Sequence, residues 1–126
     1  MQQAIGDSIA AFYAATQELG IENDVTTFTA ADFGRTLTVN GDGTDHGWGS
    51  HHFVVGGSVR GGDIYGNLPQ AQLEHDQDAG NGRLIPNVSV EQYAAPLGRW
   101  FGLNNTELTN ALPGLANFPA GPLSYI

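Results

Sequence analysis

Apolar residues recur every three or four positions near the start of the chain, and this spacing predicts a helix over residues 3–20. Residues 25–29 follow after a short link, and all five are β-branched or aromatic, which favours a strand. A helix, a short link and a strand together indicate an α/β fold. The apolar stripe expected to face the body of the domain comprises Ile5, Ile9, Phe12, Thr16 and Leu19.

Residues 52–59 form a second apolar segment, expected to be a strand that is interrupted by Gly56 and Gly57. Residues 30–50, between the two expected strands, are predicted to form a long loop without secondary structure, and a loop of that length is usually functional or disordered. Residues 63–66 are expected to form a short paired strand, and residues 67–82 a polar surface loop.

A second helix is predicted to begin after Ser89, because Ser89 and Gln92 have the spacing of a capping box. Pro96 lies inside this helix and removes one backbone hydrogen bond, so we expect a kink or a break near Ala95. Gly102 is expected to end the helix. A short helical turn is predicted from residue 105 to residue 112, and an extended tail containing Pro119 and Pro122 should follow.

Length and charge narrow the class of protein. The 126 residues suit a single domain spanning 1–126, and the formal net charge is −9 with no lysine. Because nucleic acids and anionic membrane surfaces both require a basic face, binding to either is not expected. The chain has no cysteine, no apolar run long enough to span a membrane and no signal-peptide pattern. The acidic excess suits a cation site.

Donor side chains for such a cation gather in and beside the predicted 30–50 loop. Asp45 and His46 are adjacent, and neighbours on an extended segment point to opposite sides. They could therefore bind two neighbouring metals, or one could bind a metal while the other orients it. His51 and His52 follow closely, and Asp32 is expected to end the first strand. Mixed imidazole and carboxylate donors favour zinc, manganese or iron over calcium. The alternative is a hydrogen-bonded surface pair without a metal.

Arg35 lies in the same stretch, and its planar guanidinium suits phosphate, sulfate or carboxylate. Serine nucleophile chemistry is not supported, because the chain has no G-x-S-x-G motif, and no glycine pattern typical of a nucleotide site occurs. We expect His75, within an acidic loop, to be solvated, and Trp48 to serve in packing.

Several segments of the chain together resemble the family catalogued as domain of unknown function 1501. The match extends over nearly the whole chain, in residues 25–36, 40–41, 44–49, 51–57, 60–62, 64–66, 83–86, 89–93 and 99–102.

This resemblance implies a distant relationship to alkaline phosphatases and sulfatases, which cleave phosphate or sulfate esters with divalent metals and a Ser, Thr or formylglycine nucleophile. It implies an α/β fold, here a partial three-layer sandwich that resembles the C-terminal part of an alkaline phosphatase-like domain. The resemblance makes Asp45 and His46 metal ligands, adds His51 or His52 as a further ligand and places Asp32 as a strand-end acid. A small anionic substrate would be the partner.

Full members of the family are several times longer and are exported through the twin-arginine route to the periplasm or beyond. The nucleophile-bearing half and the export signal have no counterpart here, so we expect Met1 to begin a fragment that is inactive alone. Such a fragment would pair with a missing N-terminal segment or self-associate through an open sheet edge. The alternative is a secreted or periplasmic binding or structural module that keeps the fold without catalysis.

Overall fold

The computed structural model describes residues 2–118 and 121–126, so the expectations for Met1 and Pro119 lie outside the described residues. Contacts divide the chain into two compact units. The first unit contains the residues up to 30, residues 52–63 and Ile126, and the second contains residues 31–51 and 64–125. The expectation of a single domain stays a prediction.

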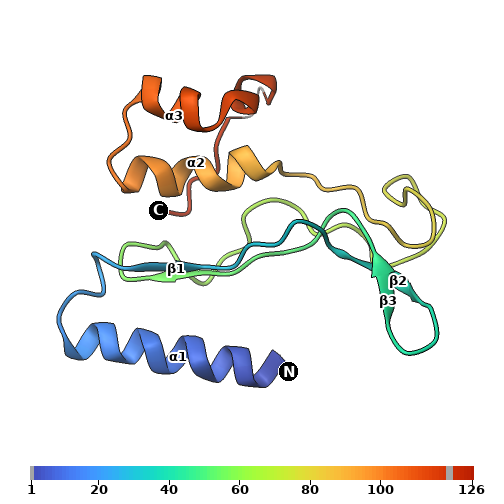
Figure 1. Cartoon of the computed structure of the whole chain (residues 1–126), viewed down its shortest axis with the longest axis horizontal. Helices are drawn as coiled ribbons and strands as arrows, with labels where there is room; N and C mark the ends of the chain where they lie inside the picture. Colours follow the sequence, from blue (N-terminus) through green and yellow to red (C-terminus); the bar gives the residue numbers. More distant parts are fainter. Residues whose placement is uncertain (1, 119–120) are drawn as a thin grey trace. The chain divides into compact units, whose positions relative to one another are not determined.

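The first unit consists of one helix and a two-stranded antiparallel sheet (Figure 1). Helix α1 spans Gln2–Glu18, strand β1 spans Thr26–Phe28 and strand β4 spans Val54–Gly56. Thr26 pairs with Gly56 and Phe28 with Val54. The predicted helix and both flanking strands are therefore confirmed, although the strands are shorter than the apolar segments that predicted them. Asp32 does not end the first strand as expected, because β1 ends four residues earlier at Phe28.

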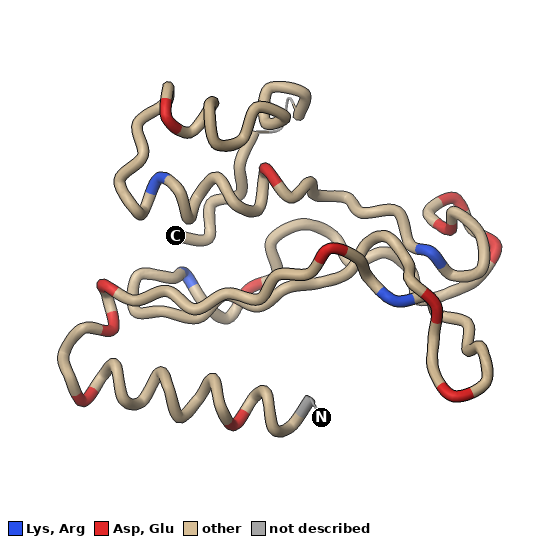
Figure 2. The backbone as a smooth tube through the Cα atoms, viewed as in Figure 1, with Lys and Arg blue, Asp and Glu red and all other residues tan. Residues whose placement is uncertain are grey.

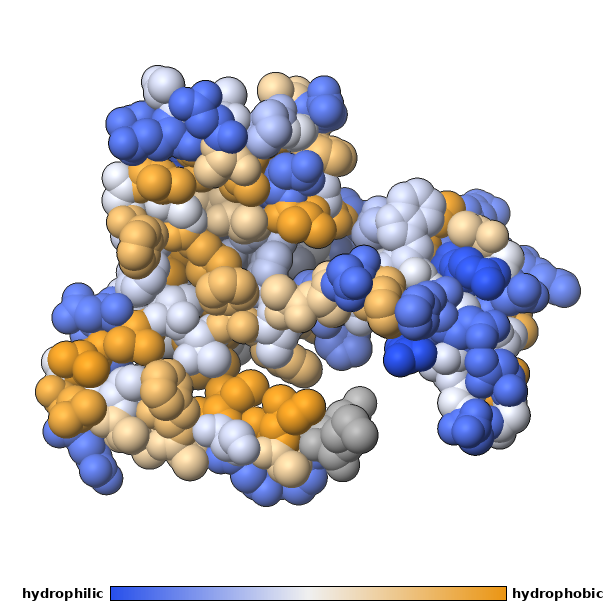
Figure 3. Space-filling model, viewed as in Figure 1, coloured by the Kyte–Doolittle hydropathy of each residue, from blue (hydrophilic) through white to orange (hydrophobic). Residues whose placement is uncertain are grey.

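The buried side of α1 coincides only in part with the predicted stripe. Thr16 is buried and Tyr13 is half-buried, whereas Ile5, Phe12 and Leu19 are each more than half exposed. The hydroxyl of Thr16 can be buried because it donates a hydrogen bond to the carbonyl oxygen of Tyr13. Apolar side chains accordingly reach the surface over α1, as Figure 3 shows. Spacing alone identified an apolar helix without deciding which of its sides packs.

The second unit contains a β-hairpin in the stretch that was expected to be an irregular loop. Strand β2 spans Arg35–Val39 and strand β3 spans Thr44–His46, and the two are antiparallel. The prediction of a structureless 30–50 segment is wrong, because β2 carries β-branched residues and its Thr36 is buried. The turn uses Gly41 at φ 112°, a conformation that favours glycine, and Asn40 N–H donates to Gly43 O at 3.0 Å.

The remaining secondary structure is helical. Helix α2 spans Val90–Trp100, helix α3 spans Asn105–Ala111 and a 3-10 helix, η1, spans Pro113–Asn117. No strand is present at residues 63–66, so that prediction is wrong. The α/β class is confirmed by helices and small sheets within the described ranges, and the alkaline phosphatase-like architecture stays a prediction. No helix among the described residues has the length and apolar character needed to cross a bilayer.

Helix α2 continues through Pro96 as one helix, so the expected break near Ala95 is wrong, and the alternative of a kink stays a prediction. A proline nitrogen cannot donate to the carbonyl four residues earlier, which here belongs to Gln92. That carbonyl accepts from Leu123 N–H at 3.1 Å instead, so a distant segment takes the hydrogen bond that Pro96 leaves open. The predicted capping box is confirmed, since Ser89 Oγ accepts from Gln92 N–H and Gln92 Oε1 accepts from Ser89 N–H.

The C-terminal segment packs on α2 through further polar contacts. Gln92 Nε2 donates to Gly121 O at 2.7 Å, and the Tyr125 hydroxyl donates to the carbonyl of Tyr93. The Tyr125 side chain is buried, at 2% exposure, and this burial raises the pKa of its phenol. Residues 121–126 form neither helix nor strand, as expected for an extended tail.

The polar 67–82 segment contains an ordered turn organised by one carboxylate. Asp78 Oδ2 accepts from Glu74 N–H, and Asp78 Oδ1 accepts from Gly80 N–H and Gly82 N–H, at 2.8–2.9 Å. These backbone donors, that of Glu74 foremost, lower the pKa of Asp78 despite some desolvation. The turn borders the hairpin, because Leu37 N–H donates to Gly82 O at 3.1 Å.

Replacing Asp78 should loosen this turn and remove its pH dependence. Because the folded-state pKa is lowered, the ionised Asp78 contributes stability above about pH 4, and that stability is lost as the pH falls through the folded-state pKa. Hydrogen exchange of the Glu74, Gly80 and Gly82 amides measures the effect. In Asp78→Asn these amides should exchange faster than in the unmodified protein at pH 6, whereas Asp76→Asn, the same charge change nearby, should not alter them. Equal protection in both variants would contradict the role of Asp78.

Replacing Gln92 should release the C-terminal segment from α2. Gln92→Ala removes the donor to Gly121 and the capping acceptor, for a loss of about 1–3 kcal/mol in the free energy of unfolding. Ser89→Ala removes only the cap, at about 1 kcal/mol, and serves as the control. Urea unfolding gives both values, and amide exchange at Leu123 should rise only for Gln92→Ala. An unchanged exchange rate of the Leu123 amide in Gln92→Ala would show that the side-chain bond to Gly121 is not what holds the segment.

Candidate functional site

The hairpin places Arg35 and His46 directly opposite each other as Cα partners of the β2–β3 ladder. Directly opposed residues of an antiparallel pair lie on the same face, where their side chains can interact. Both side chains are exposed to solvent. An imidazole and a guanidinium therefore share one face at the end of the hairpin away from its turn.

Phe33, two residues before Arg35, supports both of these side chains. Its ring stacks on the imidazole of His46, with ring centroids 3.7 Å apart and an interplanar angle of 16°. The guanidinium carbon of Arg35 lies 5.4 Å from the centroid of the same ring, within cation–π range. Arg35 Nη1 also donates to Thr44 O at 2.8 Å. The orientation of the guanidinium is thus defined by one carbonyl and one aromatic ring.

Asp45 has different partners from His46, as alternation along a strand requires. Its carboxylate accepts a hydrogen bond from Asn40 Nδ2 at the hairpin turn. Its N–H donates to Thr36 Oγ1 at 3.1 Å, and that hydroxyl donates to Thr38 O at 2.9 Å. The buried Thr36 hydroxyl therefore accepts a backbone hydrogen bond at the point where the β2–β3 register is irregular.

Glycines next to these residues let three backbone segments approach closely. Gly34 N–H donates to Trp48 O at 2.9 Å, and Gly47 N–H donates to Gly34 O at 2.7 Å. A Cβ on Gly34 would lie 2.2 Å from the carbonyl oxygen of Gly49, a distance that backbone atoms cannot accommodate. Gly49 N–H in turn donates to Leu84 O at 2.7 Å. The glycines of this stretch thus have a packing role that composition alone did not assign.

The two further histidines belong to different units. His51 is exposed and lies in the second unit with Asp32, Asp45 and His46, whereas His52 lies in the first unit. His52 Nδ1 is 3.2 Å from Thr29 Oγ1, and that oxygen also accepts from Phe53 N–H at 2.9 Å.

No three His, Asp or Glu side chains gather as a preformed metal site within residues 2–118 and 121–126. The adjacent Asp45 and His46 have the donor types that zinc, manganese or iron accept, and they make up an incomplete ligand set. Their assignment as ligands stays a prediction.

Two other expectations need correction. His75 is half-buried rather than fully solvated: its Nδ1 accepts from Gln77 N–H at 3.3 Å, and its Nε2 is buried with no hydrogen-bond partner in the described part of the chain. Trp48, expected to pack, is exposed, and its backbone carbonyl rather than its indole makes the structural contact with Gly34.

Phe33 and Asn40 were not singled out from the sequence, although they contact His46 and Asp45. Period-two spacing was an available signal for Phe33, because residues 33 and 35 of an extended segment lie on one side. The identification of Asn40 required the hairpin turn, which brings residues 40 and 45 together.

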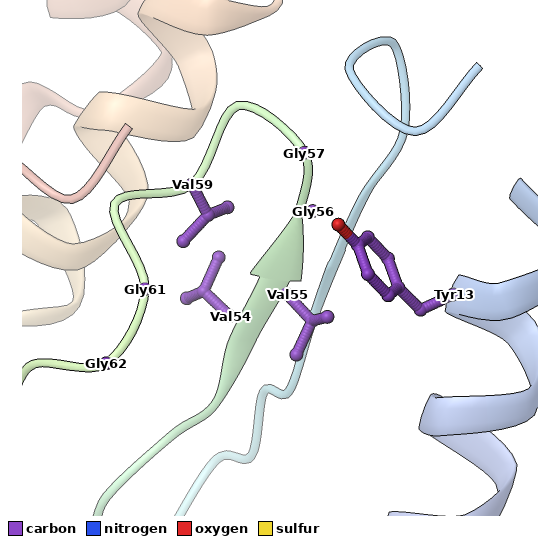
Figure 4. A pocket seen from close by; sticks show the side chains of 8 residues that line it. All are labelled: Tyr13, Val54, Val55, Gly56, Gly57, Val59, Gly61 and Gly62. Carbon is purple, nitrogen blue, oxygen red and sulfur yellow. The ribbon is translucent and has the colours of Figure 1, made fainter. Parts of the chain in front are cut away.

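A shallow cavity of about 390 Å³ lies wholly within the first unit. It is lined by Tyr13, three valines and glycine backbone, and the Tyr13 hydroxyl points towards Gly56 (Figure 4). No charged or metal-ligating side chain lines it.

Figure 2 shows acidic residues on most segments of the chain and few basic ones. The Arg35 and His46 face therefore has stronger candidate chemistry than the cavity.

Comparison with known proteins agrees with the resemblance seen in the sequence. Residues 1–115 match the family described as protein of unknown function (DUF1501). No curated protein and no solved structure matches the chain. Because the match extends over most of its length, the chain belongs to the DUF1501 family.

Proposed function

We propose that the chain supplies metal ligands and the anion-binding group of a phosphate- or sulfate-ester hydrolase related to alkaline phosphatases and sulfatases. One observation carries the proposal: Arg35 lies directly opposite His46 on one hairpin face, and His46 is adjacent to Asp45. A cation-binding donor pair and a guanidinium are the groups that an anionic ester requires.

Asp45 and His46 would each bind a divalent zinc, manganese or iron ion, and because their side chains point to opposite sides of β3 they would serve neighbouring ions. His51 and Asp32, which belong to the same unit, would be further ligands, and His52 as the alternative to His51 stays a prediction. When bound, the ion would supply Lewis-acid stabilisation of negative charge on the phosphoryl or sulfuryl oxygens. Arg35 would orient the ester by donating N–H groups to its non-bridging oxygens, since a guanidinium matches an oxyanion with two parallel donors. Its bond to Thr44 O sets the direction of the remaining donors.

The nucleophile and the remaining ligands would come from polypeptide outside these 126 residues, so the chain alone would bind metal and anion without turnover. Support comes from the large apolar side chains exposed on both units, which a further segment could cover. The family resemblance supports export to the periplasm or the exterior, and self-association through exposed apolar surface stays a prediction.

The second candidate is a non-catalytic binding module of the same family. It is favoured by the internal contacts of the site: Asp45 accepts from Asn40, and Arg35 donates to the Thr44 carbonyl. Side chains with such partners can serve structure without a metal. Metal binding separates the two candidates.

Alanine substitution of the proposed ligands should weaken binding of Zn²⁺. Equilibrium dialysis of the purified chain against Zn²⁺, Mn²⁺ or Fe²⁺ should give bound metal, and Asp45→Ala and His46→Ala should each lower the Zn²⁺ affinity by about tenfold or more, as losses around metal sites commonly do. His75→Gln, at the histidine outside the site, is the control and should bind as the unmodified chain does. Unchanged metal content in both site variants would reject the hydrolase proposal and favour the binding module.

Removal of the Arg35 guanidinium should weaken anion binding. Titration with inorganic phosphate, followed by NMR shifts of the β2–β3 amides, should show roughly tenfold weaker binding for Arg35→Gln, because a charged hydrogen bond is lost. Arg35→Lys should recover only part of the affinity, since an ammonium lacks the planar fork. Arg99→Gln makes the same charge change on α2 and should leave phosphate binding intact. Equal losses in the Arg35→Gln and Arg99→Gln variants would mean that net charge, and not this site, governs binding.

A further inference from the structure

We infer that Phe33 is the positioning residue of this site, which holds the His46 imidazole in a metal-accepting orientation and the Arg35 guanidinium in an anion-accepting one. The inference rests on the proposed function, because it names the residue that orients the two groups on which that function depends. Neither composition nor motif content points to Phe33, and its role follows from its two ring contacts.

The geometry of the stack suits a metal ligand. The lone pairs of an imidazole lie in the plane of its ring, and the Phe33 ring covers a face of His46 with the planes only 16° apart. A neighbour stacked on the face restricts rotation of the imidazole without covering the nitrogens at its edge. Fixing an exposed ligand in this way lowers the entropy that metal binding would otherwise cost.

The same ring also restricts Arg35. An exposed arginine samples many rotamers, and a cation 5.4 Å from an aromatic centroid is attracted by the negative face of the ring. The Thr44 carbonyl fixes one end of the guanidinium, and the ring limits the remaining motion. The orientations of the imidazole and the guanidinium therefore depend on the same side chain, because both groups contact the Phe33 ring.

Backbone structure explains how Phe33 reaches both partners. Residues 33 and 35 lie on one side of an extended segment, and Gly34 between them pairs with Trp48 and Gly47 through two backbone hydrogen bonds. His46 is the cross-strand partner of Arg35. Phe33 is itself half-buried, while its two partners are exposed.

Substitution of Phe33 by leucine and by tyrosine tests the inference. Phe33→Leu keeps apolar bulk and removes the flat ring, so we expect Zn²⁺ and phosphate affinities to fall by about two- to tenfold. Phe33→Tyr keeps the ring and should restore both affinities to within about twofold. Phe101→Leu, at an exposed aromatic of the same unit outside the site, is the matched control and should change neither affinity. Thermal unfolding of each variant verifies that it is folded.

The outcomes separate this inference from the proposed function. If His46→Ala and Arg35→Gln weaken binding but Phe33→Leu binds as tightly as the unmodified chain, the positioning role is overturned and the proposed function stands. If the unmodified chain binds neither Zn²⁺ nor phosphate, both are overturned. Should Phe33→Leu fail to fold, nuclear Overhauser contacts between the Phe33 and His46 rings in the Zn²⁺-loaded unmodified chain decide the question, and their absence would reject the inference.

Discussion

In the β2–β3 hairpin, Arg35 is paired with His46, and this register decides which side chains share the candidate site. A shift of one residue would exchange the faces of a strand, because side chains alternate with a period of two. Arg35 would then lie opposite Asp45 or Gly47, and the imidazole would lose its place beside Phe33. The register is maintained by the buried hydroxyl of Thr36, which accepts from the Asp45 N–H within the irregular stretch between Arg35 and Val39, and by the backbone pairing of Gly34 with residues 47 and 48.

Hydrogen bonds from side chains to the backbone stabilise this chain where a large apolar core stabilises other domains. Among the described residues the buried apolar set is small: Ala95, Leu108 and Tyr125. The second unit instead relies on carboxylates, amides and hydroxyls that satisfy backbone groups, with Asp78 in the turn next to the hairpin and Gln92 beneath the C-terminal segment. Such bonds hold loops in one conformation, as a site built on a hairpin requires.

The net charge of the chain affects which ligands the proposed site can attract. A formal net charge of −9 repels an anionic ester and attracts cations. A proposed divalent ion at His46 would reverse the local sign, and Arg35 would add a second positive group on the same face. In this proposed arrangement the metal would strengthen anion binding, and one aromatic ring would orient both binding groups.

The amino-acid sequence by itself determined the features whose causes are local. The first helix, the two apolar strands and the Ser89–Gln92 capping box were predictable because each depends on residues within a few positions of one another. The family was likewise apparent from short motifs. Only the tertiary structure decided the hairpin within residues 30–50, the side of α1 that packs, and the uninterrupted α2. In α2, Pro96 leaves the carbonyl of Gln92 without its helical donor, and the N–H of Leu123, 31 positions after Gln92, donates to that carbonyl. The same holds for the site, where residues 33 and 46 meet through backbone pairing and close glycine approach, which no local pattern encodes.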